Sequence, residues 1–471
     1  MVPELVRDSK ALFFAEIANT LFGLGIVVIL SRDLGAELFG LWVSVFSVFQ
    51  IASMLNFGFP TIIVREGAKS VEELGGILSL FRRAQAYLSI LIIPFCVSIT
   101  VLLYGKNMES MEIIFVGFAF VCAVLQQINR AGLRVIGQAP REVAITFLDR
   151  GSVFILLVLV SLMNLESLVY YIIAYNFGPF LGLLYSIKII NKSVPKDVGS
   201  KFQLFEILRM SAPFGAGLIA RPIRDGALKV ILSVLGGFTA VAIFEIAWKA
   251  YIAGSSVSNA IRKSMLPVFS RSASSSYDLG LAMNHGYRVS KWVIQFGIFL
   301  GALSSLLIPE IFSNQYIESR DVFLLLLPSW SILVICSTWI VAVESIMEGV
   351  KFARIMINQA ILTILVSLVY SMLTNQEFLH SLLVGIFVGE VYVSWQSYDM
   401  IRKIMSPGIP IGELFFSITF CIILCACYSV SIMIVSFELM AVTISANVFW
   451  MWKSKWSIKI PKIEPSGAGE I

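Results

Sequence analysis

The sequence predicts an all-α protein that spans a membrane about fourteen times, with two six-helix lobes related by an internal repeat and two further helices after them. Hydrophobic residues make up 58% of the 471 residues and charged residues only 14%, and the mean hydropathy is +0.87. Soluble proteins, by comparison, carry about 25% charged residues. Apolar runs of about 20 residues, long enough to cross a bilayer, alternate with short polar connections. Lysine and arginine are also distributed unequally between alternate connections, as in membrane proteins.

The apolar runs place the expected helices along the chain. We expect membrane helices at Ala11–Leu30; Leu41–Ile63; a run ending at Tyr104; Met111–Ile128; Val143–Met163; Ser167–Ile190; Pro213–Gly237; Phe238–Val257; a run ending at Ile308; Val322–Glu344; Ile355–Leu373; Leu379–Tyr398; Leu414–Ile432; and Ile434–Trp452. Charges interrupt the apolar residues of 64–83, so this segment is expected to lie at the membrane interface. Asp149 and Arg150 are expected close to the charged end of their helix.

The longest charged connection, residues 191–210, divides the chain into halves. We expect an N-terminal lobe at 1–200, a C-terminal lobe at 201–405, two extra helices at 406–456 and a cytoplasmic tail at 457–471. A shift of about 202 residues superposes the tight connections that enter the second helix of each half. It places Gly35, Phe39, Gly40 and Trp42 on Gly237, Val241, Ala242 and Phe244. Parallel repeats of this kind put a substrate site near the membrane midplane, between the two bundles.

Lysine and arginine gather in alternate connections. One side of the expected layout holds nearly all of those in the connections, whereas the other has only Arg32, Lys106 and Arg320. Because cytoplasmic connections are enriched in these residues, both termini are expected in the cytoplasm and the protein in the cytoplasmic membrane. The first helix lacks the small-residue cleavage pattern of a removable signal peptide. The net charge of +5 indicates orientation in the membrane, and no nucleic-acid partner is expected.

The run Pro213–Gly237 carries four charges in its middle, at Arg221, Arg224, Asp225 and Lys229. A charge at the bilayer centre costs roughly 2.5–3.5 kcal/mol on insertion scales, so these side chains cannot face lipid. On a helix they fall within about 140° of arc, which leaves the opposite side free for lipid or packing. We expect their neighbour to be water or an anion.

Carboxylates inside the expected helices are candidates for binding a coupling proton or sodium ion, because such residues are rare in membranes and often functional. These candidates are Glu16, Asp225, Glu245 and Glu390. An alternative stays open, in which Asp225 with Lys229, and Glu245 with Lys249, form local ion pairs four residues apart. Pro222 is either a hinge in its helix or an incidental bend.

No motif in the sequence indicates catalysis or a bound cofactor. The phosphate-binding pattern GxxxxGK[ST] is absent, so ATP is not expected to drive the protein directly. All six cysteines lie in or beside apolar runs without a metal-ligand spacing, so we expect buried free thiols and no metal site. The protein is therefore expected to be a transporter rather than an enzyme.

Several segments together resemble the multidrug/oligosaccharidyl-lipid/polysaccharide (MOP) exporter superfamily, most closely its Wzx-type polysaccharide flippases. They are SRDLGAELFGLW, FGFPTIIVREGAK, NRAGLRVIGQAPRE, SAPFGAGLIARPIRDGALKVIL, VAIFEIAWKAY, MLPVFSR and IPEIFSNQY, and they span most of the first 360 residues. The resemblance implies a V-shaped pair of six-helix lobes that opens alternately to the two sides. It also implies a polyprenyl phosphate or diphosphate substrate that carries a sugar unit, with membrane lipids and possible glycan-assembly proteins as partners.

A cationic cavity open sideways would let the phosphate and glycan cross while the lipid tail stays in the membrane. Guanidinium groups suit phosphate because they offer several donors in a fixed fork. We therefore predict head-group contacts from Arg221 and Arg224 first, then from Lys229 and Lys249. Two other functions remain open: an ion-coupled drug or cation antiporter of the same fold, and a membrane-embedded glycan polymerase or glycosyltransferase. The antiporter would favour a cavity dominated by carboxylates, and the enzyme a sizeable exposed loop or domain.

Overall fold

The computed structural model describes residues 2–53, 58–67, 71–165, 167–194, 204–272, 276–346, 349–404 and 423, and these form helices joined by short turns, without strands. Its elements are α1 Val2–Ser53, α2 Phe59–Gly67, η1 Val71–Glu73, α3 Leu74–Tyr104, α4 Ser110–Val135, α5 Ala139–Thr146, η2 Phe147–Gly151, α6 Ser152–Leu162, α7 Leu168–Ser193, α8 Leu204–Leu235, α9 Gly237–Ser272, α10 Ser276–Ser305, α11 Ile308–Phe312, η3 Asn314–Tyr316, α12 Ile317–Ile346, α13 Gly349–Thr374 and α14 Phe378–Ile404. The two helices expected within 414–452, apart from residue 423, and the expected tail at 457–471 lie outside the described residues.

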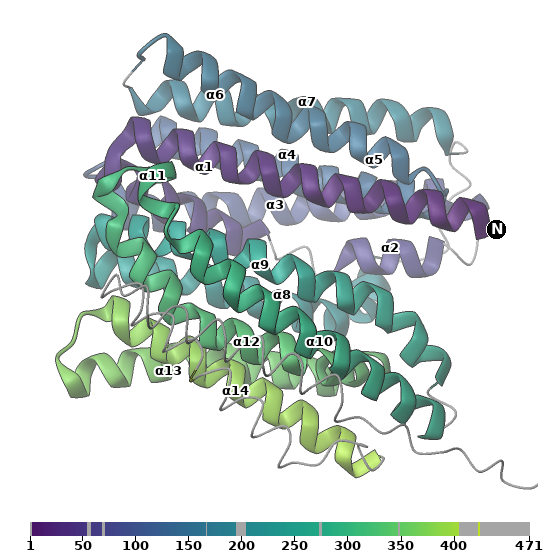
Figure 1. Cartoon of the computed structure of the whole chain (residues 1–471). Helices are drawn as coiled ribbons and strands as arrows, with labels where there is room; N and C mark the ends of the chain where they lie inside the picture. The colour runs from purple at the N-terminus through teal and green to yellow at the C-terminus, as the bar shows by residue number, and fades with distance from the viewer. Residues whose placement is uncertain are drawn as a thin grey trace, which may run out of the picture.

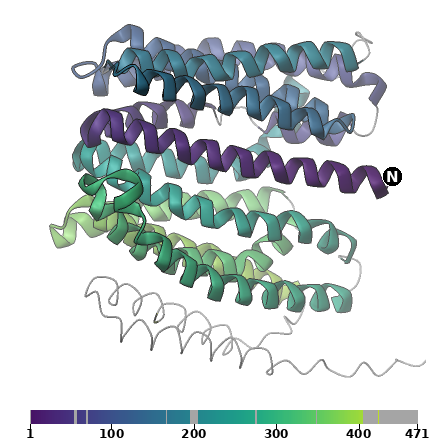
Figure 2. The same cartoon turned by 45° about the horizontal axis from the view of Figure 1, so that its top comes forward.

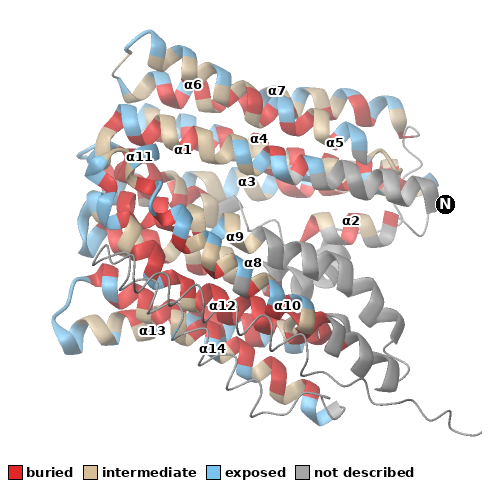
Figure 3. Cartoon of the chain, viewed as in Figure 1, coloured by how far each residue is buried: buried red, intermediate tan, exposed pale blue. Residues whose placement is uncertain are grey.

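The helices form two groups that lie side by side, which we call the first half (α1 to α7) and the second half (α8 to α14) (Figure 1). The same separation is visible after rotation (Figure 2). Helix α1 packs against both α8 and α9, and so joins the halves. Buried residues gather where helices face each other, and exposed residues lie on the outer faces (Figure 3).

Many of the exposed side chains are large and apolar, such as Leu102, Leu91 and Met372, which is the arrangement that lipid requires. Among the described residues, eight helical stretches are long and apolar enough to cross a membrane. They are Ile17–Ile51, Leu74–Tyr104, Ser110–Val135, Pro140–Leu162, Leu168–Ser193, Asn314–Val343, Val350–Thr374 and Phe378–Lys403. The protein is therefore a multi-pass membrane protein, as its composition predicts.

The proposed repeat has a backbone counterpart at two glycines. Gly35 interrupts α1 with φ 71° and ψ 173°, so α1 consists of two helices that meet at a sharp bend. Gly237, which aligns with Gly35 in the repeat, also has a positive φ, of 81°, where α8 passes into α9. Residues with a side chain rarely adopt this conformation, so each half needs glycine at the same tight connection.

Several expected boundaries were wrong, and two of them lie around the second and third expected helices. The helix expected to continue to Ile63 ends at Ser53, and a separate short helix, α2, follows Gly58. Gly58 has a φ of 72°, which an α-helix does not accommodate, so a continuous helix cannot pass through it. Pro60 lies in the first turn of α2, where its missing backbone donor is tolerated. Residues 74–83 of the expected interfacial segment are the first turns of α3. Arg82 is accommodated there because its Nε donates a hydrogen bond to Asn129 Oδ1 (2.8 Å).

The described hydrogen bonds between the halves gather at one end of the bundle, which we call the closed end. They join Arg32 to the backbone oxygen of Glu310 (2.6 Å), Tyr316 to the backbone oxygen of Ser31 (2.8 Å), Gln315 to the same oxygen (3.5 Å), and the hydroxyls of Tyr104 and Ser233 (2.6 Å). The ring of Phe39 packs against Tyr316 at the same place. The halves are therefore fastened together at one end.

Replacing Gly40 with alanine is expected to destabilise the protein. The added Cβ would lie 1.8 Å from the backbone oxygen of Phe238, so the two halves would have to separate beside the closed end. Overpacking of this kind costs about 1–3 kcal/mol. Gly23→Ala, also in α1, is the matched control, because no atom lies within 4 Å of a Cβ placed there. Thermal unfolding of the purified variants compares the two, and equal stability would contradict the close packing at Gly40.

Candidate functional site

Two cavities of about 290 Å³ each contain most of the intramembrane charges. The inter-half cavity is lined by α1, α4, η2 and α7 from the first half and by α8 and α9 from the second. The second-half cavity is lined by α8, α9, α12 and α13. Helix α8 contributes to both: Arg221, Arg224 and Asp225 line the second-half cavity, and Lys229 lines the inter-half cavity. The four charges expected to share one site on α8 thus belong to two.

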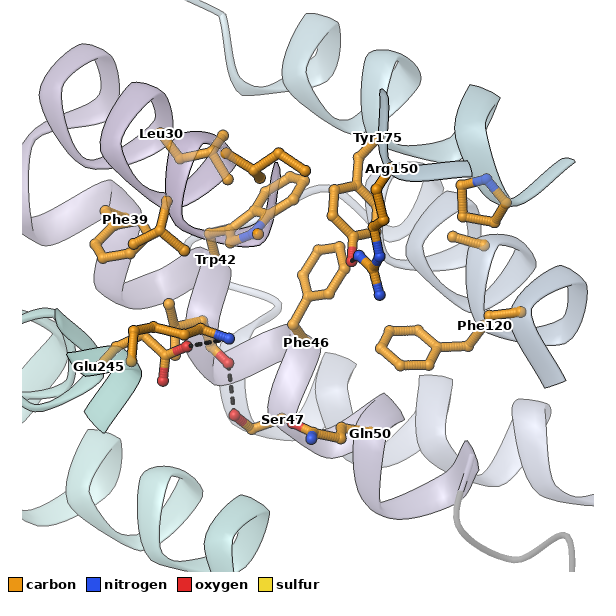
Figure 4. A pocket seen from close by; sticks show the side chains of 18 of the residues that line it. Leu30, Phe39, Trp42, Phe46, Ser47, Gln50, Phe120, Arg150, Tyr175 and Glu245 are labelled. Carbon is orange, nitrogen blue, oxygen red and sulfur yellow. Dashed lines mark hydrogen bonds and ion pairs between the residues drawn. The ribbon is translucent and has the colours of Figure 1, made fainter. Parts of the chain in front are cut away.

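The inter-half cavity has a chemically different wall on each side (Figure 4). The second half contributes Lys229, Glu245 and Lys249. The first half contributes aromatic rings, two glutamines, one cation and one carboxylate, namely Phe39, Trp42, Phe46, Phe120, Tyr175, Gln50, Gln127, Arg150 and Asp149. The cavity therefore combines positive charge, hydrogen-bonding groups and aromatic surface, which a ligand with a charged head and a polar ring could use together.

Glu245 holds two lysines at the second-half wall. Its carboxylate forms ion pairs with Lys229 Nζ from α8 (2.5 Å) and with Lys249 Nζ from its own helix (3.2 Å). Lys229 and Glu245 are buried, whereas 36% of the Lys249 side chain is exposed. The pair of Glu245 with Lys249 has the spacing that the sequence predicts. The alternative pair of Asp225 with Lys229 was wrong, because Lys229 turns to Glu245 on the neighbouring helix.

Arg150 is a site residue that the sequence analysis missed. It lies within the π-helical turn Phe147–Gly151, which joins α5 to α6. Single π-turns inside α-helices are frequent at functional sites. The Nη1 of Arg150 donates a hydrogen bond to the hydroxyl of Tyr175 (3.2 Å). Among the described residues no carboxylate forms an ion pair with Arg150, because its neighbour Asp149 pairs with Arg130 instead (3.5 Å).

The signal for Arg150 is present in the sequence. It sits well inside the span Pro140–Leu162, where an unrelieved charge is as costly as on the helix Pro213–Gly237. Because Asp149 and Arg150 were expected at a charged helix end, they were not predicted as site residues. The helix in fact begins at Ala139, about three turns earlier than this pair, and the two residues reach the interior.

The second-half cluster, comprising Arg221, Arg224, Asp225 and Glu390, is paired internally. One terminal nitrogen of Arg221 lies 3.0 and 2.9 Å from the two carboxylate oxygens of Glu390. Arg224 donates to Asp225 (2.8 Å) and to Glu390 (3.2 Å). Arg224 and Glu390 are almost completely buried, at 1% and 0% exposed. Two cations face two carboxylates, so this cluster is formally neutral, and it links α8 to α14.

Two remaining candidates are only partly defined. Glu16 lies in α1, but its side chain is outside the described part. Pro222 lies inside α8, which continues as a helix on both sides, and its ring borders the second-half cavity. Its role as a hinge stays a prediction. The described residues contain no group of three or more His, Cys, Asp or Glu side chains that could hold a metal ion.

Solved structures share this fold. The inward-facing conformation of a multidrug resistance MATE family transporter of the MOP superfamily has 15% sequence identity and a TM-score of 0.66, over 82% of this chain and 94% of that chain. The outward-facing conformation of such a transporter has 16% identity and a TM-score of 0.61, over 85% and 95%. A MOP superfamily transporter from Pyrococcus furiosus, described by a reverse polarity of its binding pocket that suggests a different function, has 16% identity and a TM-score of 0.63, also over 85% and 95%. No curated protein matches the sequence.

The family described as "Polysaccharide biosynthesis protein" matches residues 5–273, which is more than half of the chain. This match agrees with the resemblance to polysaccharide flippases, and the solved structures confirm the expected MATE-like fold. We conclude that the chain belongs to the polysaccharide biosynthesis protein family.

Proposed function

We propose that the protein is a flippase that moves a polyprenyl phosphate- or diphosphate-linked oligosaccharide across the cytoplasmic membrane by alternating access. The phosphate and the first sugars would cross through the inter-half cavity, while the polyprenyl tail stays in lipid. Cell-surface polysaccharide or glycan assembly is the process that such a transporter would serve, with glycan-assembly proteins as possible partners. The family match and the transporter fold support this class of function.

The observation that carries the proposal is the unpaired cation in the inter-half cavity. Its described lining holds three cations, Arg150, Lys229 and Lys249, and two carboxylates, Asp149 and Glu245. Asp149 pairs with Arg130, outside that lining, and no carboxylate of the described residues forms an ion pair with Arg150. A guanidinium in a low-dielectric cavity attracts an anion strongly, and a phosphate can accept two of its donors at once. Arg150 therefore replaces Arg221 and Arg224 as our first choice for the head-group contact.

The closed end supports an assignment of the transport state. If both termini are cytoplasmic, as the charge distribution predicts, the connections between α3 and α4 and between α8 and α9 face outward, and the closed end is the outer end. The cavity would then load substrate from the cytoplasmic side. Breaking the hydrogen bonds at the closed end would accompany release to the outside.

A coupling proton or sodium ion is part of the proposal. Among the described candidates Glu245 is the best placed, because it shares the inter-half cavity with the substrate and holds Lys229 and Lys249. Neutralising Glu245 would release both lysines to bind phosphate. Asp225 and Glu390 would first have to break their ion pairs with arginine before either could bind a coupling ion.

The two other functions fit the cavities less well. A drug or cation antiporter needs a carboxylate that is free to bind a cation, whereas Asp149, Asp225 and Glu245 all have cationic partners. Transport of an organic cation by the purified protein would support the antiporter instead. A glycan polymerase or glycosyltransferase would form a new glycosidic product from a lipid-linked donor, and such a product would overturn the flippase.

Replacing Arg150 with glutamine is expected to reduce translocation of a lipid-linked oligosaccharide at least about tenfold, because the cavity loses its unpaired charge. Arg141→Gln is the matched control. Arg141 lies on the same helical segment but is exposed and bonded to Ser193, away from the cavity. Flipping is measured in proteoliposomes or by genetic complementation, with insertion and thermal stability checked for both variants. Undiminished flipping by Arg150→Gln would remove the proposed anion site.

The second-half cluster is expected to stabilise the fold rather than bind substrate. Arg224→Met should lower stability by up to about 3–5 kcal/mol, since Asp225 loses its arginine and the buried Glu390 keeps only Arg221. Adding Glu390→Gln should recover part of that loss, and a double-mutant cycle measures the coupling. If Arg224→Met leaves thermal unfolding unchanged but weakens binding of a polyprenyl diphosphate, the cluster is a substrate site and our assignment is wrong.

A further inference from the structure

The first-half wall of the inter-half cavity contains a continuous set of aromatic rings. Phe46 stacks on Trp42 with ring centroids 4.3 Å apart, and it meets Tyr175 edge-on at 4.7 Å and Phe120 at 5.5 Å. Trp42 is only 4% exposed, so it serves mainly to support the ring of Phe46 from behind. Phe46, Phe120 and Tyr175 are half-buried and border the cavity. We call these three rings the aromatic wall.

The aromatic wall is directly connected to the unpaired cation. The hydroxyl of Tyr175 accepts the hydrogen bond from Arg150. In Figure 4 the guanidinium points from Tyr175 toward the space that Phe46 and Phe120 border. Arginine has five N–H donors, and this contact uses one of them. A phosphate held by Arg150 would therefore have its substituent placed against the rings.

The chemistry of the wall fits a sugar ring. A pyranose has C–H groups on its two faces and hydroxyls around its edge. The C–H faces pack well on the electron-rich faces of aromatic rings. The cavity also has polar groups at its edge, at Gln50, Gln127 and the hydroxyl oxygen of Ser47.

The size of the cavity limits what can be bound there. About 290 Å³ is at the small end of the range for ligand sites, which is roughly 300–1,000 Å³. It suits a phosphate and the sugar next to it, but not a whole oligosaccharide. A site of this size would recognise the proximal sugar and remain tolerant of the distal glycan.

We propose that Phe46, Phe120 and Tyr175 bind the sugar ring that is attached directly to the phosphate, beside Arg150. This inference rests on the proposed function and assigns the sugar-binding part of the same site. Arg150 sets affinity for the phosphate, and the aromatic wall sets the preference for a lipid that carries a sugar. The two contributions are separable, because they act on different parts of the substrate.

The test compares two probes on the purified full-length chain in lipid nanodiscs: an undecaprenyl diphosphate without sugar and the same lipid carrying one N-acetylhexosamine. The wild type is expected to bind the sugar-bearing lipid at least about threefold more tightly, the lower part of the range for one aromatic contact. Phe46→Leu, and separately Phe120→Leu, should bring this ratio close to one and change binding of the bare lipid little. Arg150→Gln should weaken both lipids and leave the ratio unchanged.

Phe49→Leu is the matched control. Phe49 is completely buried behind the wall, stacks on Phe120 and does not line the cavity. It should lower thermal stability without altering the ratio. A wild-type ratio of one, or a preserved ratio in both wall variants, overturns the sugar site while leaving the flippase proposal standing. Unchanged binding of both lipids by Arg150→Gln overturns the proposed phosphate site instead.

Discussion

The arrangement of this protein depends on the cost of charge inside a membrane. An ionised side chain in hydrocarbon must find an opposite charge, water or a ligand. Most of the intramembrane charges here find partners on other helices: Glu390 of α14 holds two arginines of α8, and Glu245 of α9 holds Lys229 of α8. These ion pairs fix how α8 is rotated against its neighbours. Among the described residues Arg150 forms no ion pair with a carboxylate, and it lies at a cavity between the halves.

This pairing gives the second-half cluster and the inter-half cavity different roles. The second-half cluster is neutral, and its Arg224 and Glu390 are buried, so it is suited to hold helices together while the halves move as units. The inter-half cavity has residual positive charge and lies where two moving halves would meet. A ligand bound there would contact both halves at once. Its binding energy could therefore favour one arrangement of the halves over the other, as alternating access requires.

Much of the fold could be predicted from the sequence. Membrane helices form their backbone hydrogen bonds internally, so length and hydropathy are enough to identify them. The glycines at 35 and 237 also carried a readable signal, since only glycine suits the tight connection. The end of the second helix was misplaced because apolar residues continue past Gly58. In the site, the pair of Glu245 and Lys249 was predictable from its spacing of four residues. The pairs of Lys229 and of Glu390 join different helices, and helical spacing alone carries no information about them.

Arg150 is a second site feature that could not be predicted from spacing along one helix. Arg150 was expected near a charged helix end because the helix was expected to begin at Val143, whereas it begins at Ala139. The π-turn that carries Arg150 has no simple sequence signature. The structure is needed to show that Asp149 contacts Arg130 and that no carboxylate of the described residues forms an ion pair with Arg150.

The central claim is that the unpaired Arg150 receives the phosphate of a lipid-linked sugar in the inter-half cavity. Its most direct test is an experimental structure of the full chain bound to an undecaprenyl diphosphate-linked sugar. We expect the phosphate within hydrogen-bonding distance of the Arg150 guanidinium, with Lys249 nearby and Arg221 still paired with Glu390. A phosphate bound to Arg221 in the second-half cavity, with Arg150 free of ligand, would contradict the claim.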